Sequence, residues 1–318
     1  MLVQRSKIRS DEYPIAGDER GAFKRDATPE MRLTRTCMTM FAEAFKLPHG
    51  QDILERLLRP KARSAARYIL EFESLAGLHG NLQAPSRYLV DLMSDGLTVR
   101  GVEHIPPCGP VLITCNHPGV FDAMAIFASL LRTDVKVVAR PRTLLDVLAN
   151  VRRHIIFVPD DPVGGTATLR EALRHLADGG LLVTFPRGRI EPDPLLHPQA
   201  AIESVAEWSS SVNLLAKHTP GLTVIPAAVG GVVSTRARAS WLARCYRGEA
   251  DRDWMAATLQ FMLSTYRDVK PIAVYGAPIC EGNVLQQVQI ATRELYRNIK
   301  IMEQTEGPGL HVTRKDVS

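Results

Sequence analysis

Short apolar runs alternate with longer segments of helical periodicity through most of the chain after Leu97. Glycine, proline or polar residues bound the apolar runs, which predicts short buried strands. The predicted strands cover residues 111–114, 135–139, 155–158, 181–185, 222–229 and 271–275. The segments between and after them predict helices over residues 123–131, 143–151, 166–176, 200–217, 254–266 and 284–302. Because strands and helices alternate, we expect an α/β fold with a mixed, largely parallel sheet flanked by helices.

The part of the chain before Leu97 has helical periodicity and no predicted strand. Residues 1–28 are charged and have little apolar periodicity, so we expect a loose arm there. Helices are predicted from Thr28-Pro29 to about residue 48, over 53–58 up to Pro60, over 62–78 and over 86–93. We therefore expect an N-terminal arm and helical segment over residues 1–96, an α/β domain over 97–304 and a flexible tail over 305–318.

A histidine and an aspartate follow the first predicted strand of the α/β domain, at positions His117 and Asp122. Five steps on a regular helix would place them about 140° apart, on different faces. Pro118 disfavours helical conformation at the residue before it, so we expect His117 in the turn and Asp122 in the first turn of the next helix. Asp122 could then hold one imidazole nitrogen and leave the other as a base. Taken alone, the spacing favours the alternative that both residues only cap the helix.

Asn116-His117 and Asp122 resemble the NHxxxxD motif of the glycerolipid acyltransferases, the superfamily of lysophosphatidic acid and glycerol-3-phosphate acyltransferases. Other segments of the chain are similar to three further blocks of that family, in the same order: residues 99–106, 185–190 and 224–228. Four ordered blocks are far more specific than one motif. The resemblance extends from about Leu97 to about Pro278.

The resemblance implies an O-acyltransferase that moves a fatty acyl group from acyl-CoA or acyl carrier protein to a hydroxyl of a lysophospholipid or glycerol-phosphate-type acceptor. It makes residues 97–304 the catalytic domain, His117 the general base and Asp122 the residue that orients it. The family uses direct attack without an acyl-enzyme, and the absence of a GxSxG nucleophile elbow from the sequence agrees with this. The acyl donor is a co-substrate; we expect no other cofactor.

An acceptor phosphate would need cations, preferably forked guanidinium groups. Arg187 and Arg189 flank Gly188 after one predicted strand, and Arg140 follows another. The predicted substrate-binding residues are Asn116, Arg140, Phe185, Pro186, Arg187, Gly188 and Arg189. The alternative for Arg187 is a surface charge or an ion pair with Glu191 or Asp193.

The sequence departs from the family pattern at two of the four blocks. Arg187 stands where the family usually has glutamate, and Pro159-Asp160-Asp161 stands where the second block usually ends in an Asp-Arg pair. Two alternatives therefore stay open beside the implied activity. One is an acyltransferase for an acceptor other than glycerol phosphate, such as an amine or a sugar. The other is a non-catalytic acyl- or lipid-binding protein that retains the fold.

Composition and charge narrow the classes of partner. The chain is 45% hydrophobic and 23% charged, which is typical of a globular protein. Its net charge of +5 and pI near 9.0 suit phosphorylated substrates, an acidic carrier protein or an anionic membrane surface. Aromatic residues are only 6%, and no basic stripe is interleaved with them, so nucleic acid is not an expected partner.

The cysteine pattern and the length of the apolar runs indicate in which cellular compartment we expect the protein. The five cysteines are scattered without a CxxC pair, so we expect free thiols in a reducing cytoplasm and no metal site. Cys115 lies close to His117, but a packing role fits the end of a buried strand better than a nucleophile. No apolar run approaches the roughly 18 residues of a membrane span, and the N-terminus has no signal core. We expect a cytoplasmic protein, with peripheral attachment to the cytoplasmic membrane face as a further option.

Overall fold

The computed structural model describes residues 28–46, 52–119, 121–158, 162–305 and 310–311. The predicted N-terminal arm, up to residue 27, lies outside the described residues. The helical character predicted for the segment that follows is confirmed by three helices: α1 (Pro29–Ala44), α2 (Asp52–His79) and α3 (Gln83–Met93). Helix α1 begins where predicted, because Pro29 stands in its first turn and Thr28 Oγ1 accepts a hydrogen bond from Met31 N.

Helix α2 continues through Pro60, where the sequence predicted a break between two helices. A proline inside a helix removes a backbone hydrogen bond and crowds the preceding turn, at a cost of about 3 kcal/mol. Side chains on both sides of Pro60 nevertheless belong to one core: Leu58, Ala62, Ala65, Ala66 and Ile69. Burial along one continuous face outweighs the local cost, so the prediction of two separate helices was wrong.

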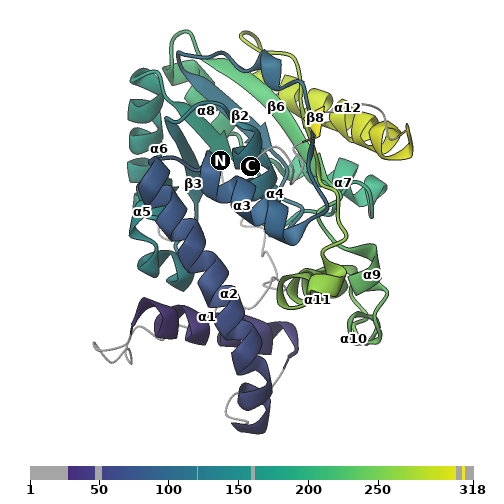
Figure 1. Cartoon of the computed structure of the whole chain (residues 1–318). Helices are drawn as coiled ribbons and strands as arrows, with labels where there is room; N and C mark the ends of the chain where they lie inside the picture. Colours follow the sequence, from purple (N-terminus) through teal and green to yellow (C-terminus); the bar gives the residue numbers. More distant parts are fainter. Residues whose placement is uncertain (1–27, 47–51, 120, 159–161, 306–309, 312–318) are drawn as a thin grey trace, which may run out of the picture.

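Eight strands form one sheet in the order β4-β3-β5-β2-β6-β7-β1-β8 (Figure 1). They are β1 (Thr98–Arg100), β2 (Val111–Cys115), β3 (Val135–Ala139), β4 (Ile155–Phe157), β5 (Leu181–Thr184), β6 (Thr223–Gly230), β7 (Ile272–Tyr275) and β8 (Leu310–His311). Strands β2 to β6 are mutually parallel. Strand β7 is antiparallel to β6, and β8 is antiparallel to β1. The predicted mixed, largely parallel sheet is confirmed.

Helices cover both faces of the sheet, as the fully apolar strands predict. In β2, Val111, Ile113 and Cys115 pack on one face with residues of the N-terminal helices, and Leu112 packs on the other. The remaining helices are α4 (Asp122–Ser129), α5 (Ala149–Arg152), α6 (Pro162–Ala177), α7 (Pro198–Ser204), α8 (Ser211–His218), α9 (Thr235–Arg238), α10 (Trp241–Arg244), α11 (Glu249–Met262) and α12 (Val284–Thr305). Residues of α6, α7, α8 and α12 form the core on the second face.

The single helix predicted over residues 200–217 was wrong, because the chain leaves helical conformation at Trp208. Helix α7 passes into a 3₁₀ turn at Val205–Glu207, and α8 begins only at Ser211. Trp208 has extended backbone angles, its indole N–H donates to Glu191 Oε1 at 2.6 Å, and Ser209 N donates to Pro186 O at 3.0 Å. Contacts with the neighbouring loop thus replace the helical hydrogen bonds at the break.

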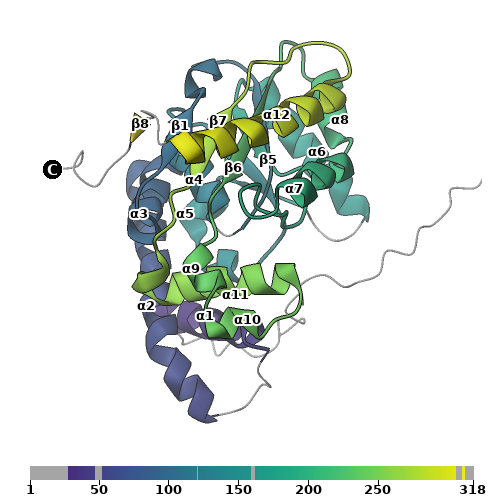
Figure 2. The same ribbon diagram turned by 90° about the vertical axis from the view of Figure 1, so that its right-hand side faces the viewer.

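The C-terminal part differs from the sequence-based expectation in two places. Helices α9 and α10 were not predicted; with α11 they lie between β6 and β7 in the chain, and Figure 2 shows them grouped with α1 below the sheet. Helix α12 ends at Thr305, and within the predicted tail Leu310–His311 form strand β8 against β1. The proposed domain boundaries stay predictions.

Candidate active site

The carboxyl ends of four parallel strands meet at one edge of the sheet, where α/β folds bind their ligands. His117 follows β2, and Arg140 follows β3. The turn of residues 185–189 follows β5, and the loop to α9 follows β6. The sheet therefore brings to one edge the segments that the sequence separates by many residues.

His117 and Asp122 are in direct contact at this edge. His117 Nδ1 lies 2.6 Å from Asp122 Oδ2, and the other carboxylate oxygen accepts a hydrogen bond from Ala123 N at 2.7 Å. Asp122 is the first residue of α4 and its side chain is fully buried, whereas the His117 side chain is 30% exposed. The Phe185 ring lies 4.8 Å from the imidazole, centroid to centroid. A carboxylate on Nδ1 favours the tautomer in which Nε2 is a free acceptor.

Glu191 holds the backbone of His117 from the other side, and the sequence had suggested it only as a partner for Arg187. Its Oε2 accepts a hydrogen bond from His117 N at 2.9 Å, and its own N–H donates to His117 O at 2.7 Å. Oε1 accepts the Trp208 indole N–H. The carboxyl is buried, and burial raises its pKa, although the hydrogen bonds oppose the shift. Both backbone polar groups of the histidine are thus fixed by one residue.

The surrounding charges set the protonation of His117. Burial lowers the pKa of the imidazole, but the carboxylates of Asp122 and Glu191 outweigh it, so the pKa is raised above its ordinary value. The positive charge of Arg142 acts in the opposite direction. Arg142 lies two residues after the predicted Arg140, and both side chains are exposed. Arg142 is thus the arginine after β3 whose charge acts on the pKa of His117, and substrate binding by Arg140 stays a prediction.

Asn116 is one of the substrate-binding residues predicted from the sequence. In the structure its side chain contacts the backbone of another strand. Its side chain is fully buried, its Nδ2 donates to Val229 O at 2.9 Å and its Oδ1 accepts from Val229 N at 2.8 Å. The amide thereby ties the end of β2 to the end of β6. With both of its polar groups engaged, Asn116 fits a positioning role, and its contact with substrate stays a prediction.

Replacing Asn116 with alanine is expected to destabilise the fold by roughly 2–4 kcal/mol, because two buried backbone groups of Val229 lose their partner. Urea denaturation measures the change. Asn298→Ala, at an exposed position of α12, is the matched control and should stay within about 0.5 kcal/mol of the wild type. A loss of less than about 1 kcal/mol in Asn116→Ala would contradict the structural role.

The turn of residues 185–189, called the β5 turn below, places Arg187 and Arg189 on either side of Gly188. Gly188 has a φ of 72°, which favours glycine. Pro186, in the same turn, is buried. Both arginines pair with Glu207, so the alternative pairing of Arg187 with Glu191 or Asp193 is wrong. Gly188 N donates to Phe185 O at 2.9 Å and is therefore engaged within the turn. Asp193 instead accepts the backbone N–H groups of Leu195, Gly231 and Val232.

Cys115 has no accessible thiol. Its side chain is fully buried, and burial raises its pKa well above the ordinary value. Because the thiolate is the nucleophile, this environment favours the packing role over a thiol nucleophile.

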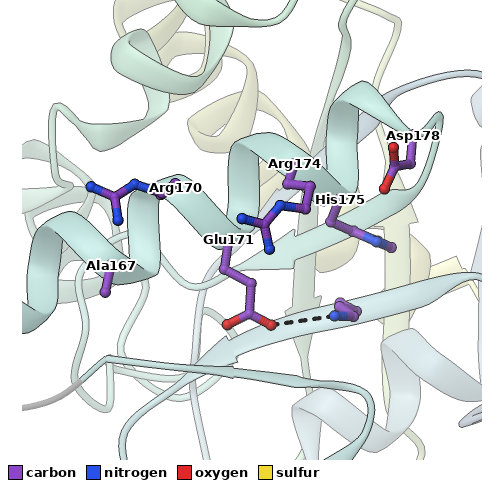
Figure 3. A pocket seen from close by; sticks show the side chains of 7 residues that line it. Ala167, Arg170, Glu171, Arg174, His175 and Asp178 are labelled. Atoms are coloured by element: carbon purple, nitrogen blue, oxygen red, sulfur yellow. Dashed lines mark hydrogen bonds and ion pairs between the residues drawn. The ribbon is translucent and has the colours of Figure 1, made fainter.

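Two surface cavities lie apart from His117. One of about 350 Å³ lies along α6, where Arg170, Arg174 and the Lys136–Glu171 ion pair line it (Figure 3). Another of about 510 Å³ lies at the amino ends of the strands, next to Arg132. Within the residues that the structure describes, no cluster of three or more His, Cys, Asp or Glu side chains is arranged to hold a metal ion.

Comparison with known proteins identifies the domain that carries this site. Residues 96–230 match the family described as Acyltransferase. This segment is an Acyltransferase-family domain. The matched segment ends with β6, so it contains His117, Asp122 and the turn that follows β5. The resemblance inferred from the four sequence blocks is confirmed.

Searches of curated proteins and of solved structures give no further assignment of function. No curated protein matches this chain. The crystal structure of the 1-acyl-sn-glycerophosphate (LPA) acyltransferase PlsC from Thermotoga maritima is similar, with 17% identity and a TM-score of 0.40, over 85% of this chain and 98% of that chain. Among the helices that the structure describes, none has the length and apolar character needed to cross a bilayer.

Proposed function

We propose that the protein transfers a fatty acyl group from acyl-CoA or acyl carrier protein to a hydroxyl of a lysophospholipid or glycerol-phosphate-type acceptor. The observation that carries the proposal is the 2.6 Å contact between His117 Nδ1 and Asp122 Oδ2 within an acyltransferase-family domain. An imidazole held in this way by a buried carboxylate is suited to general base catalysis. The net charge of +5 suits a cytoplasmic enzyme that meets anionic substrates at a membrane surface.

In the proposed reaction, His117 Nε2 takes the proton of the acceptor hydroxyl as its oxygen attacks the thioester carbonyl carbon. The tetrahedral intermediate then collapses, the carbon–sulfur bond breaks, and the thiolate takes the proton from the imidazolium. Asp122, hydrogen-bonded to Nδ1, stabilises the imidazolium while it carries the extra proton. Two products leave, an ester and a free thiol, and no acyl-enzyme forms.

The arginines of the β5 turn supply the proposed contact for the acceptor. Arg187 and Arg189 lie on the turn that follows Phe185, whose ring contacts His117, so an anion bound there would lie near the base. If both arginines stay paired with Glu207 during the reaction, a second candidate function follows, transfer to an acceptor without phosphate. In both cases the chemistry at His117 is the same, and only the acceptor differs.

Product analysis by mass spectrometry tests the proposal. Purified protein is incubated with acyl-CoA or acyl carrier protein and a panel of acceptors: glycerol 3-phosphate, lysophospholipids, a monoacylglycerol, an amine and a sugar. An acylated phosphate-bearing product is the expected result. Acylation of only the acceptors without phosphate would favour the second candidate, and the absence of any product would favour a non-catalytic binding protein.

Replacing Arg187 with glutamine is expected to raise the acceptor KM about 10- to 100-fold, because a charge-assisted contact of about 1.5–3 kcal/mol is lost. The donor KM should stay nearly unchanged in the same steady-state measurements. Arg187→Glu should be worse, since a like charge would face the phosphate. Arg297→Gln, at an exposed site of α12, is the control. Unchanged acceptor kinetics would remove Arg187 from the site, and a gain of activity on glycerol phosphate in Arg187→Glu would indicate a different natural acceptor.

A further inference from the structure

One carboxylate binds both arginines of the β5 turn. Glu207 Oε1 accepts a hydrogen bond from Arg187 Nη2 at 3.0 Å, and Glu207 Oε2 accepts one from Arg189 Nη2. Two guanidinium groups from opposite sides of Gly188 therefore converge on a single anionic group. Phosphate and carboxylate ligands are bound by arginines in the same manner, so Glu207 occupies the position of an anionic ligand.

Arg187 does not depend on Glu207 for its position. Its Nη1 donates to Ile190 O at 3.1 Å, and its side chain is only 15% exposed. Its buried Nε–H has no hydrogen-bond partner among the described residues. Nε–H and one Nη2–H point from the same edge of a guanidinium, and Glu207 takes only the Nη2 half of that edge. A phosphate group, which has three terminal oxygens, could accept from both.

Glu207 can leave this position without a change in the fold. Its backbone is fixed because Trp208 Nε1 donates to Glu191 and Ser209 N donates to Pro186 O. Its side chain is 50% exposed, so a change of side-chain rotamer is enough to bring the carboxylate into water. Exposed ion pairs contribute little stability, whereas a phosphate monoester carries close to two negative charges at neutral pH.

We propose that Glu207 is an internal competitor for the acceptor: it occupies the anion subsite of Arg187 and Arg189 and yields it to a phosphate monoester. A neutral headgroup has no charge with which to displace the carboxylate, so Glu207 makes the subsite selective for doubly charged acceptors. The identity of the bound phosphate as the acyl acceptor rests on the proposed function, but the anion subsite itself does not.

Isothermal titration with inorganic phosphate tests the competition directly, because it needs no acyl donor and no turnover. Four proteins are compared: wild type, Glu207→Gln, Arg187→Gln and the control Glu203→Gln. Glu203 is exposed on the preceding helix α7, so its replacement removes the same charge at a different place. Glu207→Gln is expected to bind phosphate about threefold to tenfold more tightly than wild type. Glu203→Gln should match wild type, and Arg187→Gln should lose binding.

Equal or weaker phosphate binding in Glu207→Gln would overturn the inference, since it would make Glu207 a residue that positions the arginines or plays no part. Binding that survives in Arg187→Gln would also overturn it, by placing the phosphate elsewhere. Glu207→Ala serves as a second variant in case glutamine keeps a hydrogen bond to either arginine. Tighter phosphate binding without any acyl transfer would sustain the anion subsite and refute the proposed function.

Discussion

Replacing His117 with asparagine is expected to lower the turnover of acyl transfer by about 10²-fold or more. Asparagine keeps a side-chain N–H that can donate to the buried Asp122 carboxylate, but it has no group that takes a hydroxyl proton at neutral pH. The melting temperature should therefore change little while turnover is lost. Both quantities are measured on the same preparation, with the acceptor that product analysis identifies.

His117→Ala removes both the proposed base and the hydrogen-bond partner of Asp122. It should lose as much turnover, but it also leaves Asp122 buried without its imidazole partner, which costs about 1–3 kcal/mol of stability. His218→Asn, at the exposed end of α8, is the control and should behave as wild type in both measurements. Turnover close to that of wild type in His117→Asn would rule out His117 as the base.

Replacing Glu191 with alanine is expected to give the second large effect, on stability and turnover together. Two buried donors, His117 N–H and the Trp208 indole N–H, would lose their acceptor, at about 1–3 kcal/mol each. The backbone of the base would then be free to shift, and turnover should fall by an order of magnitude or more. Chemical denaturation and steady-state kinetics measure the two losses.

Glu191→Gln distinguishes positioning of His117 from general stability. Glutamine has the same shape but only one acceptor oxygen, so it keeps one of the two hydrogen bonds and removes the negative charge. The pKa of His117 should fall with that charge, and the acidic limb of the pH–rate profile should move to lower pH. Glu203→Gln, an exposed charge on α7, is the matched control. A variant that loses stability but keeps the wild-type pH profile would make Glu191 a structural residue only.

The contact between His117 and Asp122 could be predicted from the sequence because it depends on local chemistry. Pro118 disfavours helical conformation at His117, and a strand and an apolar helix flank the pair on either side. The mixed, largely parallel sheet flanked by helices was predicted from the alternation of apolar runs with helical segments. These features lie within a few residues of each other, so a periodicity or a proline is enough to indicate them.

Glu191 and Glu207 could not be assigned in this way, because their partners come from distant segments. Glu191 contacts His117, 74 residues earlier in the chain. Glu207 pairs with Arg187 from the 3₁₀ turn just before Trp208, where the chain leaves helical conformation. The helical periodicity of residues 200–217 predicted one helix and did not indicate the interruption between α7 and α8. The indole contact of Trp208 with a buried carboxylate determines it, and such a contact appears only when the strands are assembled.

The pH dependence of kcat/KM in wild type and in Asp122→Asn tests the central claim most directly, since this quantity reports the free enzyme. His117 must be neutral to accept a proton, and its pKa is raised, so wild-type activity should fall as the pH decreases through a value above about 6.5. Asp122→Asn removes the main charge that raises the pKa, so its acidic limb should lie at lower pH, with a reduced maximum. Ionisation of the acceptor is common to both enzymes and cancels in the comparison. Coincident acidic limbs in the two enzymes would contradict a base at His117 controlled by Asp122.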